Sequence, residues 1–239
     1  MVEIEKQELD KWNAHCVEQY PNEACALVVD NKVIIVPNQA DDKEHTFAIR
    51  VQDFWQYHDK IQAVLHSHCV DTAKPLLLDP RTPSKADMTG QKNHGVWWGI
   101  TATEGEETTP ILWFGFDRGE PYEGRTFIHN VADCFELVRD YYRREYSHEI
   151  GQYCRQWDWF ETENLFDDYF TAEGFVEVSI DQIEPGDVVF FGIRSEKTNH
   201  IGVYVGNDRF LHHLTNRFSE YDTLARWRRH VLRVVRRKQ

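Results

Sequence analysis

The segment AVLHSH, residues 63–68, decides how the first half of this 239-residue chain folds. Its apolar residues lead directly into two histidines, a pattern that predicts a buried β-strand. Side chains alternate between the faces of a strand, so His66 and His68 share one face and Ser67 lies on the other. Two imidazole rings on one face can bind the same ion, and the segment therefore predicts a metal site.

A third ligand must come from elsewhere in the chain, because zinc in a hydrolase is held by three protein ligands and a water. Residues 84–87, SKAD, have the Ser-x-x-Asp spacing of a helix start. Asp87 is the preferred ligand, and Ser84 has the ordinary alternative role of a helix N-cap. Asp79, in a proline-flanked loop, is the second candidate ligand. Upstream, the segment PNEACALVV places Glu23 just before an apolar run.

These residues, in this order, resemble the JAMM (MPN-type) metallopeptidases, whose pattern is Glu, then His-x-His, then Ser-x-x-Asp. The resemblance implies a cytidine deaminase-like α/β domain in which His66, His68 and Asp87 hold Zn²⁺. It also implies that Glu23 takes a proton from the attacking water and that Ser84 helps to stabilise the oxyanion.

The resemblance covers most of the first half and departs from the family pattern in two places. Eighteen residues separate His68 from Asp87, more than the family usually has, so we interpret residues 70–77 as part of an insertion. Asp79 stands at the usual distance. Cys69 replaces a usual proline and is either an inert buried thiol or a stray ligand.

Further elements surround this segment. Residues 26–38 predict two strands joined by a turn, residues 53–60 predict a helix, and residues 95–103 and 111–116 predict two more strands. The segment GFDRGEPYEGR, residues 115–125, then interrupts the pattern with glycine, proline and charge. We expect an α+β protein of two domains, residues 1–117 and residues 118–239.

The second half opens with a helix that begins at a cysteine. In DCFELVRDYYRREY, residues 133–146, Asp133 is a good N-cap and Glu136 has the spacing of a capping box. Cys134 is then the first helical residue, where backbone N–H groups and the helix dipole favour the thiolate and lower the pKa of the thiol. A small buried thiol is the ordinary alternative.

Two histidines lie farther along the chain, after the predicted strand DVVFFGI. The segments HIGVYVG and RFLHHL predict two strands joined by a tight turn, with His200 on the first and His212 on the second. The hairpin places these two histidines side by side, so that one can act as base to the thiol while the other orients it. His213 is expected on the opposite face.

The Asp-Cys pair at a helix start, PGDVVFF, NHIGVYVG and FLHH resemble the NlpC-type cysteine peptidases of the papain-like fold. Those enzymes cut cell-wall stem peptides between D-glutamate and the diamino acid. The resemblance implies that Cys134 is the nucleophile, His200 the base and His212 the orienting residue. Tyr122 matches a tyrosine near the family's oxyanion site. The two residues after the cysteine, Phe-Glu, replace the usual Ser-Gly and alter the acyl pocket.

A JAMM-like part followed by an NlpC-type part and a basic end resembles the tail assembly protein K family of long-tailed phages. The resemblance implies a virion tail-tip peptidase, assembled in the host cytoplasm beside other tail-tip proteins and acting on peptidoglycan stem peptides. It would serve tail assembly or host-wall penetration. Two other functions stay open: a structural assembly factor with partly or wholly inactive peptidase folds, and a zinc isopeptidase acting on a protein substrate.

Composition argues against several other classes of protein. The formal net charge of −13 disfavours unspecific nucleic-acid binding, and the basic residues 225–239 are interpreted as a solvated edge. No apolar run reaches the roughly 18 residues that span a bilayer, and the charged N-terminal segment lacks a signal core. The five cysteines are odd in number and irregularly spaced, which favours reduced thiols.

Overall fold

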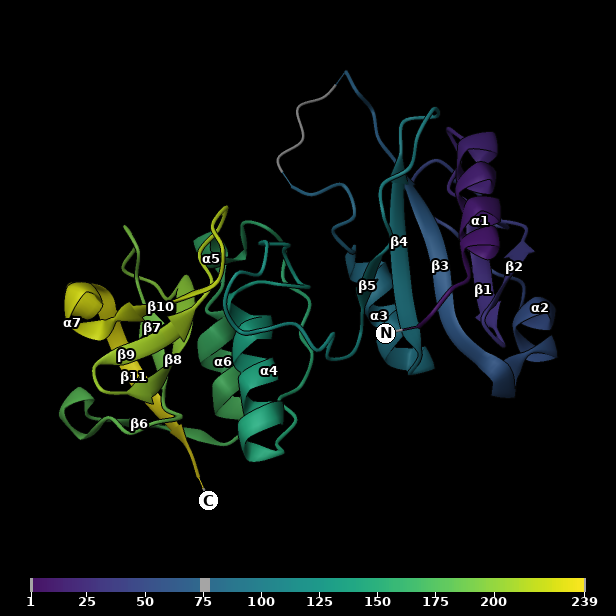
Figure 1. Cartoon of the computed structure of the whole chain (residues 1–239). Coiled ribbons are helices and arrows are strands. Elements are labelled where there is room, and N and C mark those ends of the chain that lie inside the picture. The colour runs from purple at the N-terminus through teal and green to yellow at the C-terminus, as the bar shows by residue number, and fades with distance from the viewer. Residues whose placement is uncertain (1, 74–77, 239) are drawn as a thin grey trace. The chain divides into compact units, whose positions relative to one another are not determined.

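The computed structural model describes residues 2–73 and 78–238, and the chain divides into two units, residues 1–118 and 119–239 (Figure 1). The division falls within the segment that is rich in glycine, proline and charge. Among the described residues, no helix combines the length and the apolar character that crossing a membrane requires.

A five-stranded sheet forms the centre of the first unit, with the strand order β2-β1-β3-β4-β5. Its strands are β1 (Cys25–Val29), β2 (Lys32–Val36), β3 (Ile61–Cys69), β4 (Trp97–Thr103) and β5 (Leu112–Phe114). β3 and β4 run parallel, whereas the other neighbours are antiparallel. A parallel pair needs a crossover connection, and the connection from β3 to β4 carries Asp87.

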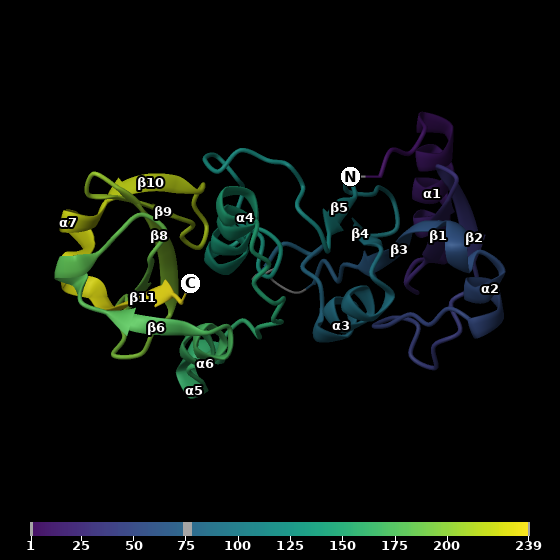
Figure 2. The same cartoon turned by 90° about the horizontal axis from the view of Figure 1, so that it is seen from below.

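Helices α1 and α3 lie on opposite faces of this sheet (Figure 2). The helices of the unit are α1 (Lys6–Gln19), α2 (Val51–Gln56), the 3-10 helix η1 (His58–Lys60) and α3 (Lys85–His94). On the α1 face, the Trp12 indole N–H donates to Thr101 Oγ1 at 2.9 Å. On the α3 face, a Cβ added to Gly90 would lie 2.5 Å from the Trp98 ring. Helix and sheet therefore pack closely where the histidines of β3 point.

A six-stranded antiparallel sheet forms the second unit, with the order β10-β9-β8-β7-β11-β6. Its strands are β6 (Phe175–Val178), β7 (Val188–Phe191), β8 (His200–Gly206), β9 (Arg209–His212), β10 (Glu220–Thr223) and β11 (Val231–Arg237). The turn between β8 and β9 consists of Asn207 and Asp208, both with positive φ. Asn and Asp tolerate that conformation, which suits a two-residue hairpin.

One long helix, α4 (Cys134–Tyr146), packs against β8 and β9. The shorter helices are α5 (Trp159–Thr162), α6 (Leu165–Ala172), η2 (Ile180–Gln182), α7 (Leu224–Trp227) and η3 (Arg228–His230). The acidic and aromatic residues 156–170 contain α5 and most of α6. Phe166 and Phe170 from this stretch are buried beside Phe135 of α4. The stretch therefore builds the core next to the start of α4.

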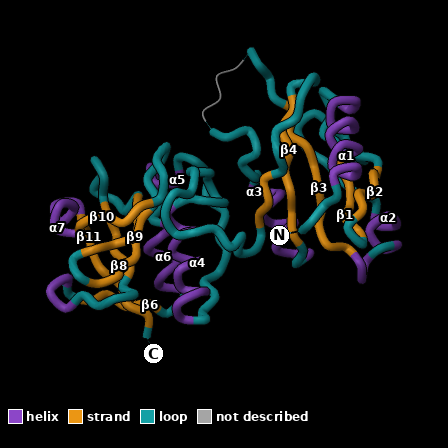
Figure 3. The backbone as a smooth tube through the Cα atoms, in the orientation of Figure 1, coloured by secondary structure: helices purple, strands orange, loops and turns teal. Residues whose placement is uncertain are grey.

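The strands and the two helices expected from periodicity are present. Helix α1 is present but is not predicted from the sequence, because only Trp12 and Cys16 of its 14 residues are buried and its apolar pattern is sparse. Residues 115–133 form a loop with isolated β-bridges only (Figure 3). This loop leads from β5 to the cysteine at the start of α4.

Candidate functional site

Three side chains from β3 and α3 converge in the first unit. His66 and His68 lie on one face of β3, and their Nε2 atoms are 3.1 Å apart. Asp87 Oδ1 lies 3.3 Å from His66 Nε2, and its Oδ2 lies 3.6 Å from His68 Nε2. One ligand atom from each residue lies within 4.8 Å of the others, which suits an ion held by three protein ligands.

The hydrogen bonds of the imidazoles fit a cation at this position. His68 contacts the Pro80 carbonyl through Nδ1 at 2.7 Å, and a carbonyl can only accept. His68 Nδ1 therefore carries the proton, and the lone pair of its Nε2 is left for another partner. Two imidazole Nε2 lone pairs at 3.1 Å repel each other unless a proton or a cation lies between them. Two imidazoles and one carboxylate form a set that zinc accepts.

The ligand positions are set by two local anchors rather than by the length of the connection between them. His68 is held in the sheet, where it pairs with Ala102 of β4. Asp87 is held at the start of α3 by a capping box: its N–H donates to Ser84 Oγ at 3.1 Å, and the Ser84 N–H donates to Asp87 Oδ2 at 2.7 Å. The long spacing between His68 and Asp87 is therefore compatible with a closed site. Of the expected insertion, residues 74–77 lie outside the described part of the chain.

Asp79, the other candidate ligand, has a different partner. Its carboxylate accepts hydrogen bonds from the Arg81 guanidinium at 3.0 and 2.8 Å and from the Arg81 backbone N–H at 2.9 Å. The bidentate pair holds the loop that contains Pro80. The structure therefore brings Asp87, and not Asp79, to the two histidines.

Glu23 is buried beside this group. Burial raises the pKa of its carboxyl to about 7, and the charges of His68 and Asp87 also act on it. A carboxyl that titrates near neutrality can both accept and release a proton at working pH. This environment suits the proton-transfer role that the resemblance implies for Glu23.

Ser84 and Cys69 are placed less favourably for chemistry. Ser84 is exposed, and its hydroxyl oxygen caps α3, the ordinary alternative for this residue. Its role at an oxyanion stays a prediction. Cys69 follows His68 on β3, so strand alternation turns it toward the opposite face. In the described residues, the metal-binding group does not include Cys69.

The cysteine of the second unit begins α4, as its sequence indicates. Asp133 is the N-cap, and its Oδ1 accepts hydrogen bonds from the backbone N–H groups of Phe135 at 3.0 Å and Glu136 at 3.1 Å. These two donors are consequently occupied. Among the described residues, no hydrogen bond is recorded for the Cys134 N–H, which leaves it as the helix donor available to an oxyanion.

The expected capping box at this helix is incomplete, and that prediction was wrong. Glu136 does not return a hydrogen bond to the N-cap backbone but pairs with Arg139 Nη1 at 2.5 Å. The Arg139 Nε–H also donates to the Ile150 carbonyl at 3.0 Å. The buried charge of Glu136 is compensated by Arg139, and this pair ties the first turn of α4 to the following loop.

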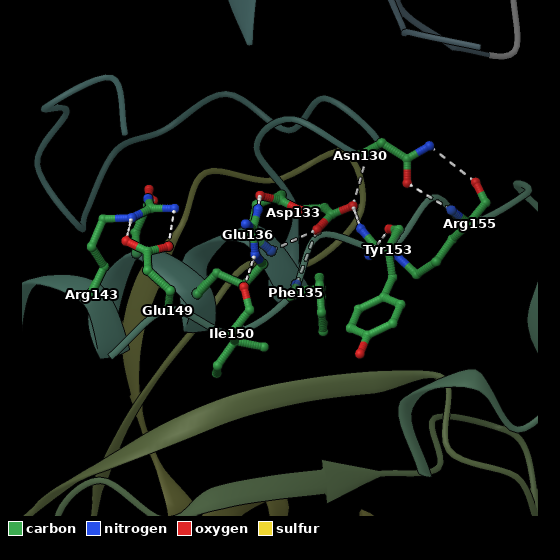
Figure 4. Close-up of polar contacts among 12 residues, drawn as sticks. Asn130, Asp133, Phe135, Glu136, Arg143, Glu149, Ile150, Tyr153 and Arg155 are labelled. Carbon is green, nitrogen blue, oxygen red and sulfur yellow. Dashed lines mark hydrogen bonds and ion pairs between the residues drawn. The ribbon is translucent and has the colours of Figure 1, made fainter. Parts of the chain in front are cut away.

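A buried polar network surrounds Asp133, the residue that precedes Cys134 in the sequence (Figure 4). Asp133 Oδ2 accepts hydrogen bonds from Arg155 Nη2 at 2.6 Å and from the Asn130 N–H at 2.8 Å. The Asn130 side-chain amide in turn binds the Arg155 backbone at both N–H and C=O. His129 Nε2 donates to the same carbonyl at 2.7 Å. Asn130, His129 and Arg155 could not be predicted from the sequence, because they lie in loops without periodicity.

We expect Arg155→Met to lower the free energy of unfolding of the second unit by about 3–5 kcal/mol, because the substitution leaves the Asp133 charge buried and unpaired. Arg228→Met is the matched control, since the Arg228–Asp181 pair at 3.0 Å is exposed and such pairs contribute about 0–1 kcal/mol. Urea unfolding measures both. Equal small effects would contradict the structural role of the Asp133–Arg155 pair.

Cys134 is not the activated thiolate that its helix position predicts. Burial raises the pKa of the Cys134 thiol to about 12, and the charge of Asp133 acts in the same direction. Arg155 and the backbone N–H groups lower this pKa but do not outweigh burial. The expectation of a lowered pKa was therefore wrong for the free protein: loss of hydration and the capping carboxylate dominate over the helix dipole.

We consequently expect Cys134 to react slowly with iodoacetamide at pH 6, with a rate that rises about tenfold per pH unit as the thiolate fraction rises. Residue-resolved mass spectrometry of the full chain between pH 5 and 9 measures this rate. A rate that is already high and constant from pH 5 to 7 would indicate a preformed thiolate–imidazolium pair, contrary to the neutral thiol inferred here.

The two hairpin histidines are in contact. His200 Nε2 lies 3.0 Å from His212 Nδ1. Gly202 stands opposite His212, and a Cβ there would come within 3.1 Å of the His212 Cβ, so glycine permits the close approach. Burial lowers the pKa of His200 well below its ordinary value and that of His212 to about 4. Both rings are neutral at pH 7, so His200 can accept a proton.

Cys134 and His200 line one cavity of about 570 Å³. Its walls also contain Phe127, His129, Asp133, Arg155, Trp157, Trp159, Phe160, Phe166, Ile193, Arg194, Asn199, His213, Leu214, Thr215 and Arg217. His213, expected on the face opposite to His212, lies one residue beyond the end of β9 and also lines this cavity, whereas His212 does not. His213 Nε2 lies 3.1 Å from the Arg217 carbonyl.

Tyr122 is not brought to the cysteine. Its hydroxyl donates to Glu145 Oε1 at 2.9 Å, and its ring lies under the Arg144 guanidinium at 5.1 Å. Glu145 is near the far end of α4, roughly 16 Å along the helix axis from Cys134 at 1.5 Å per residue. The predicted role of Tyr122 at the oxyanion was therefore wrong, because its partners hold it beside the last turn of the helix.

Residues 119–236 match the NlpC/P60 family. The matched residues include Cys134, His200 and His212. This match supports a cysteine peptidase or hydrolase in the second unit.

Along its whole length the chain is similar to the tail tip assembly protein K of Escherichia phage N15, with 28% identity over 98% of this chain and 96% of that protein. The tail tip assembly protein K of Escherichia phage lambda is 33% identical over 44% of this chain and 54% of that protein. The resemblance to the tail assembly protein K family is confirmed, whereas the JAMM-like interpretation of the first unit stays a prediction.

Solved structures of NlpC/P60 proteins are also similar to part of the chain. The NlpC/p60 domain of the peptidoglycan hydrolase SagA aligns with 48% of this chain and 89% of its own, at 16% identity and a TM-score of 0.36. NlpC1 from Trichomonas vaginalis aligns with 56% of this chain and 52% of its own, at 18% identity and a TM-score of 0.36.

Proposed function

We propose that the second unit is a papain-like cysteine peptidase domain that hydrolyses amide bonds in peptidoglycan stem peptides. The observation that carries this proposal is the cavity that Cys134 and His200 share, with His212 Nδ1 3.0 Å from His200 Nε2. Nucleophile, base and orienting group are thus available in one place. The NlpC/P60 family supports the same reaction class.

The protonation states of Cys134 and His200 in the free protein determine the order of the proposed steps. Cys134 is protonated and His200 is neutral at pH 7, so the sulfur attacks the amide carbonyl as its proton passes to the imidazole. His212 holds the ring of His200 during this transfer, and the Cys134 N–H faces the developing oxyanion. His200 then returns the proton to the leaving amine, and water releases the acyl group from the sulfur.

For the first unit we propose a JAMM-like zinc isopeptidase site. His66, His68 and Asp87 would hold the ion, which when bound supplies Lewis-acid polarisation. Glu23, whose pKa is raised to about 7, would take and return the proton of the attacking water. Asp87 also lines a mostly apolar cavity of about 510 Å³ beside Phe47, Trp55 and Trp98. A peptide with an apolar side chain suits that cavity.

We place the chain in the phage tail tip, assembled in the host cytoplasm beside other tail-tip proteins. The names of both phage relatives support a position in the tail or a role in its assembly. Such a location suits a peptidase that opens the host wall locally or processes tail components. A structural assembly factor without activity is the second candidate, supported by the same names and by the neutral thiol of Cys134.

Two inhibitors on the same full-length protein separate these functions. Muropeptides are incubated with the protein, and shortened peptides are measured by mass spectrometry. We expect iodoacetamide, applied at alkaline pH and then removed, to abolish the release, and a chelator to leave it unchanged. If only the chelator stops the release of shortened peptides, the activity would be assigned to the first unit. Absence of release in all samples would favour the assembly factor.

A further inference from the structure

The position of the proton on His212 determines whether His200 can act as a base. His200 Nε2 contacts His212 Nδ1 at 3.0 Å, so His200 Nδ1 is the ring nitrogen left to accept a proton from a thiol. A neutral imidazole has one donor and one acceptor nitrogen. If His200 Nδ1 is the acceptor, His200 Nε2 donates to His212 Nδ1, and His212 carries its own proton on Nε2. A base at His200 therefore requires one of the two tautomers of His212.

Hydrogen bonds alone do not select this tautomer. Either tautomer gives one hydrogen bond between the two rings, and in the described part of the chain the buried His212 Nε2 has no hydrogen-bond partner. The charges around His212 therefore select between the tautomers. Burial lowers the pKa of His212 to about 4, the charge of Asp222 opposes this shift, and the charges of His213 and Arg217 add to it. Asp222 is thus the negative group that can favour a proton on Nε2.

Asp222 lies on the side of His212 that faces away from His200. In the sheet, β9 lies between β8 and β10. Asp222 stands opposite Phe210, which is two residues before His212, so strand alternation places Asp222 and His212 on one face as diagonal neighbours. Because the Nδ1 edge of the His212 ring meets His200 of β8, the edge that carries Nε2 is turned toward β10. The carboxylate and this nitrogen therefore lie on the same side of the ring.

The indole of Trp227, at the end of α7, connects this carboxylate to both histidines. Its Nε1–H donates to Asp222 Oδ2 at 2.7 Å. Its ring centroid lies 5.2 Å from that of His212, at an interplanar angle of 75°, and 6.4 Å from that of His200. Neither Trp227 nor Asp222 belongs to the lining of the Cys134 cavity. The two residues therefore contact the histidines from outside the space that a substrate would occupy.

Three donors fix the Asp222 carboxylate. Besides Trp227, the Thr223 N–H donates to Oδ1 at 2.6 Å and Arg226 Nη1 donates to it at 2.9 Å. Burial raises the pKa of Asp222, but the hydrogen bonds from Trp227 and Thr223 and the charge of Arg226 lower it below its ordinary value. The carboxylate is therefore ionised at pH 7. The Arg226 side chain is 74% exposed, so water screens its charge, and the negative charge next to His212 persists.

We propose that Asp222 and Trp227 are positioning residues that hold His212 in its Nε2-protonated tautomer and thereby keep His200 Nδ1 free to accept the proton of Cys134. The inference rests on the proposed peptidase function and adds a carboxylate and an indole to the two histidines behind the nucleophile. When the thiol proton reaches His200, the Asp222 charge also stabilises the positive charge that the histidine pair then carries.

NMR of the full-length protein with nitrogen-15-labelled histidine tests the tautomer directly, because protonated and unprotonated ring nitrogens differ in chemical shift. The His212 signals are assigned by their loss in His212→Gln. At pH 7 we expect the unmodified protein to carry the His212 proton on Nε2. In Asp222→Asn, which can still accept the indole hydrogen bond, the fraction protonated on Nδ1 should rise by about threefold to tenfold. An unmodified protein with the proton on His212 Nδ1 would overturn the inference.

Kinetics on muropeptides supply the second measurement. Asp222→Asn should lower kcat by about tenfold to a hundredfold and change KM by less than about threefold, because the residue acts on the base and not on the substrate. Asp222→Glu, which restores the charge, should recover most of the loss in kcat. Asp181→Asn is the matched control: it removes the same charge from an exposed carboxylate that pairs with Arg228 at 3.0 Å, and it should keep full activity.

The two measurements separate this inference from the proposed function. An Asp222→Asn protein with the kcat and the His212 tautomer of the unmodified protein would overturn the inference and leave the peptidase proposal in place. If the unmodified protein releases no shortened peptides, the peptidase proposal fails, and the NMR spectra still show whether Asp222 sets the tautomer of His212.

Discussion

Replacing Cys134 with alanine is expected to lower the release of shortened stem peptides from peptidoglycan by roughly a thousandfold or more, because loss of a nucleophile removes the covalent route entirely. The reaction is followed by mass spectrometry of muropeptides with full-length protein. His200→Ala should have an effect of similar size, and the two changes together should add little, since both act in one step.

Cys154→Ala is the matched control for this experiment. Cys154 is a second half-buried thiol in the same unit, and it is not part of the cavity lining. It should retain nearly full activity. Peptidoglycan that stays intact with the unmodified protein, at high concentration and long incubation, would remove the wall peptidase proposal and leave a role in tail assembly.

Loss of zinc is the second large effect that we expect. The full chain should bind one zinc ion, and Asp87→Ala should weaken that binding by more than about a hundredfold, because even outer-shell changes cost 10- to 100-fold. Asp79→Ala should keep the ion, since its carboxylate is paired with Arg81 at 2.8 Å. Elemental analysis after dialysis measures the zinc content of each variant. Zinc lost with Asp79→Ala but kept with Asp87→Ala would reverse the assignment of the third ligand.

Glu23→Gln tests the same site without touching its ligands. We expect this variant to keep one zinc per chain and to lose hydrolysis of isopeptide model substrates, since glutamine cannot transfer a proton. Retained turnover in Glu23→Gln would exclude Glu23 as the base. Loss of zinc in the same variant would instead make Glu23 part of the ion's binding set.

Residues on regular strands could be placed from the sequence. Alternation along β3 predicts that His66 and His68 share a face, and the two-residue turn sets His200 and His212 side by side. In each case a local rule determines where the side chain points. The helix start at Cys134 is predictable for the same reason, since the capping residue Asp133 is its sequence neighbour.

Outside helices and strands, no such local rule determines where a side chain points. His213 lies one residue beyond the end of β9, so strand alternation no longer fixes its direction. Arg155 lies in a loop and is 22 residues from Asp133 in the sequence, so no periodic pattern of residues predicts their contact. The pKa of Cys134 depends on burial and on the summed charges around it, and these arise only when the whole unit has folded.

The capping box at the start of α3 has a consequence for how such sites are found in sequences. Ser84 and Asp87 hydrogen-bond to each other at the start of α3, and His68 is held in register with β4. The chain between His68 and Ser84 can therefore differ in length without displacing a candidate metal ligand. A search pattern that demands a fixed number of residues between the second histidine and the aspartate would miss this chain. A pattern of two anchored halves, His-x-His at a strand end and Ser-x-x-Asp at a helix start, would retrieve it.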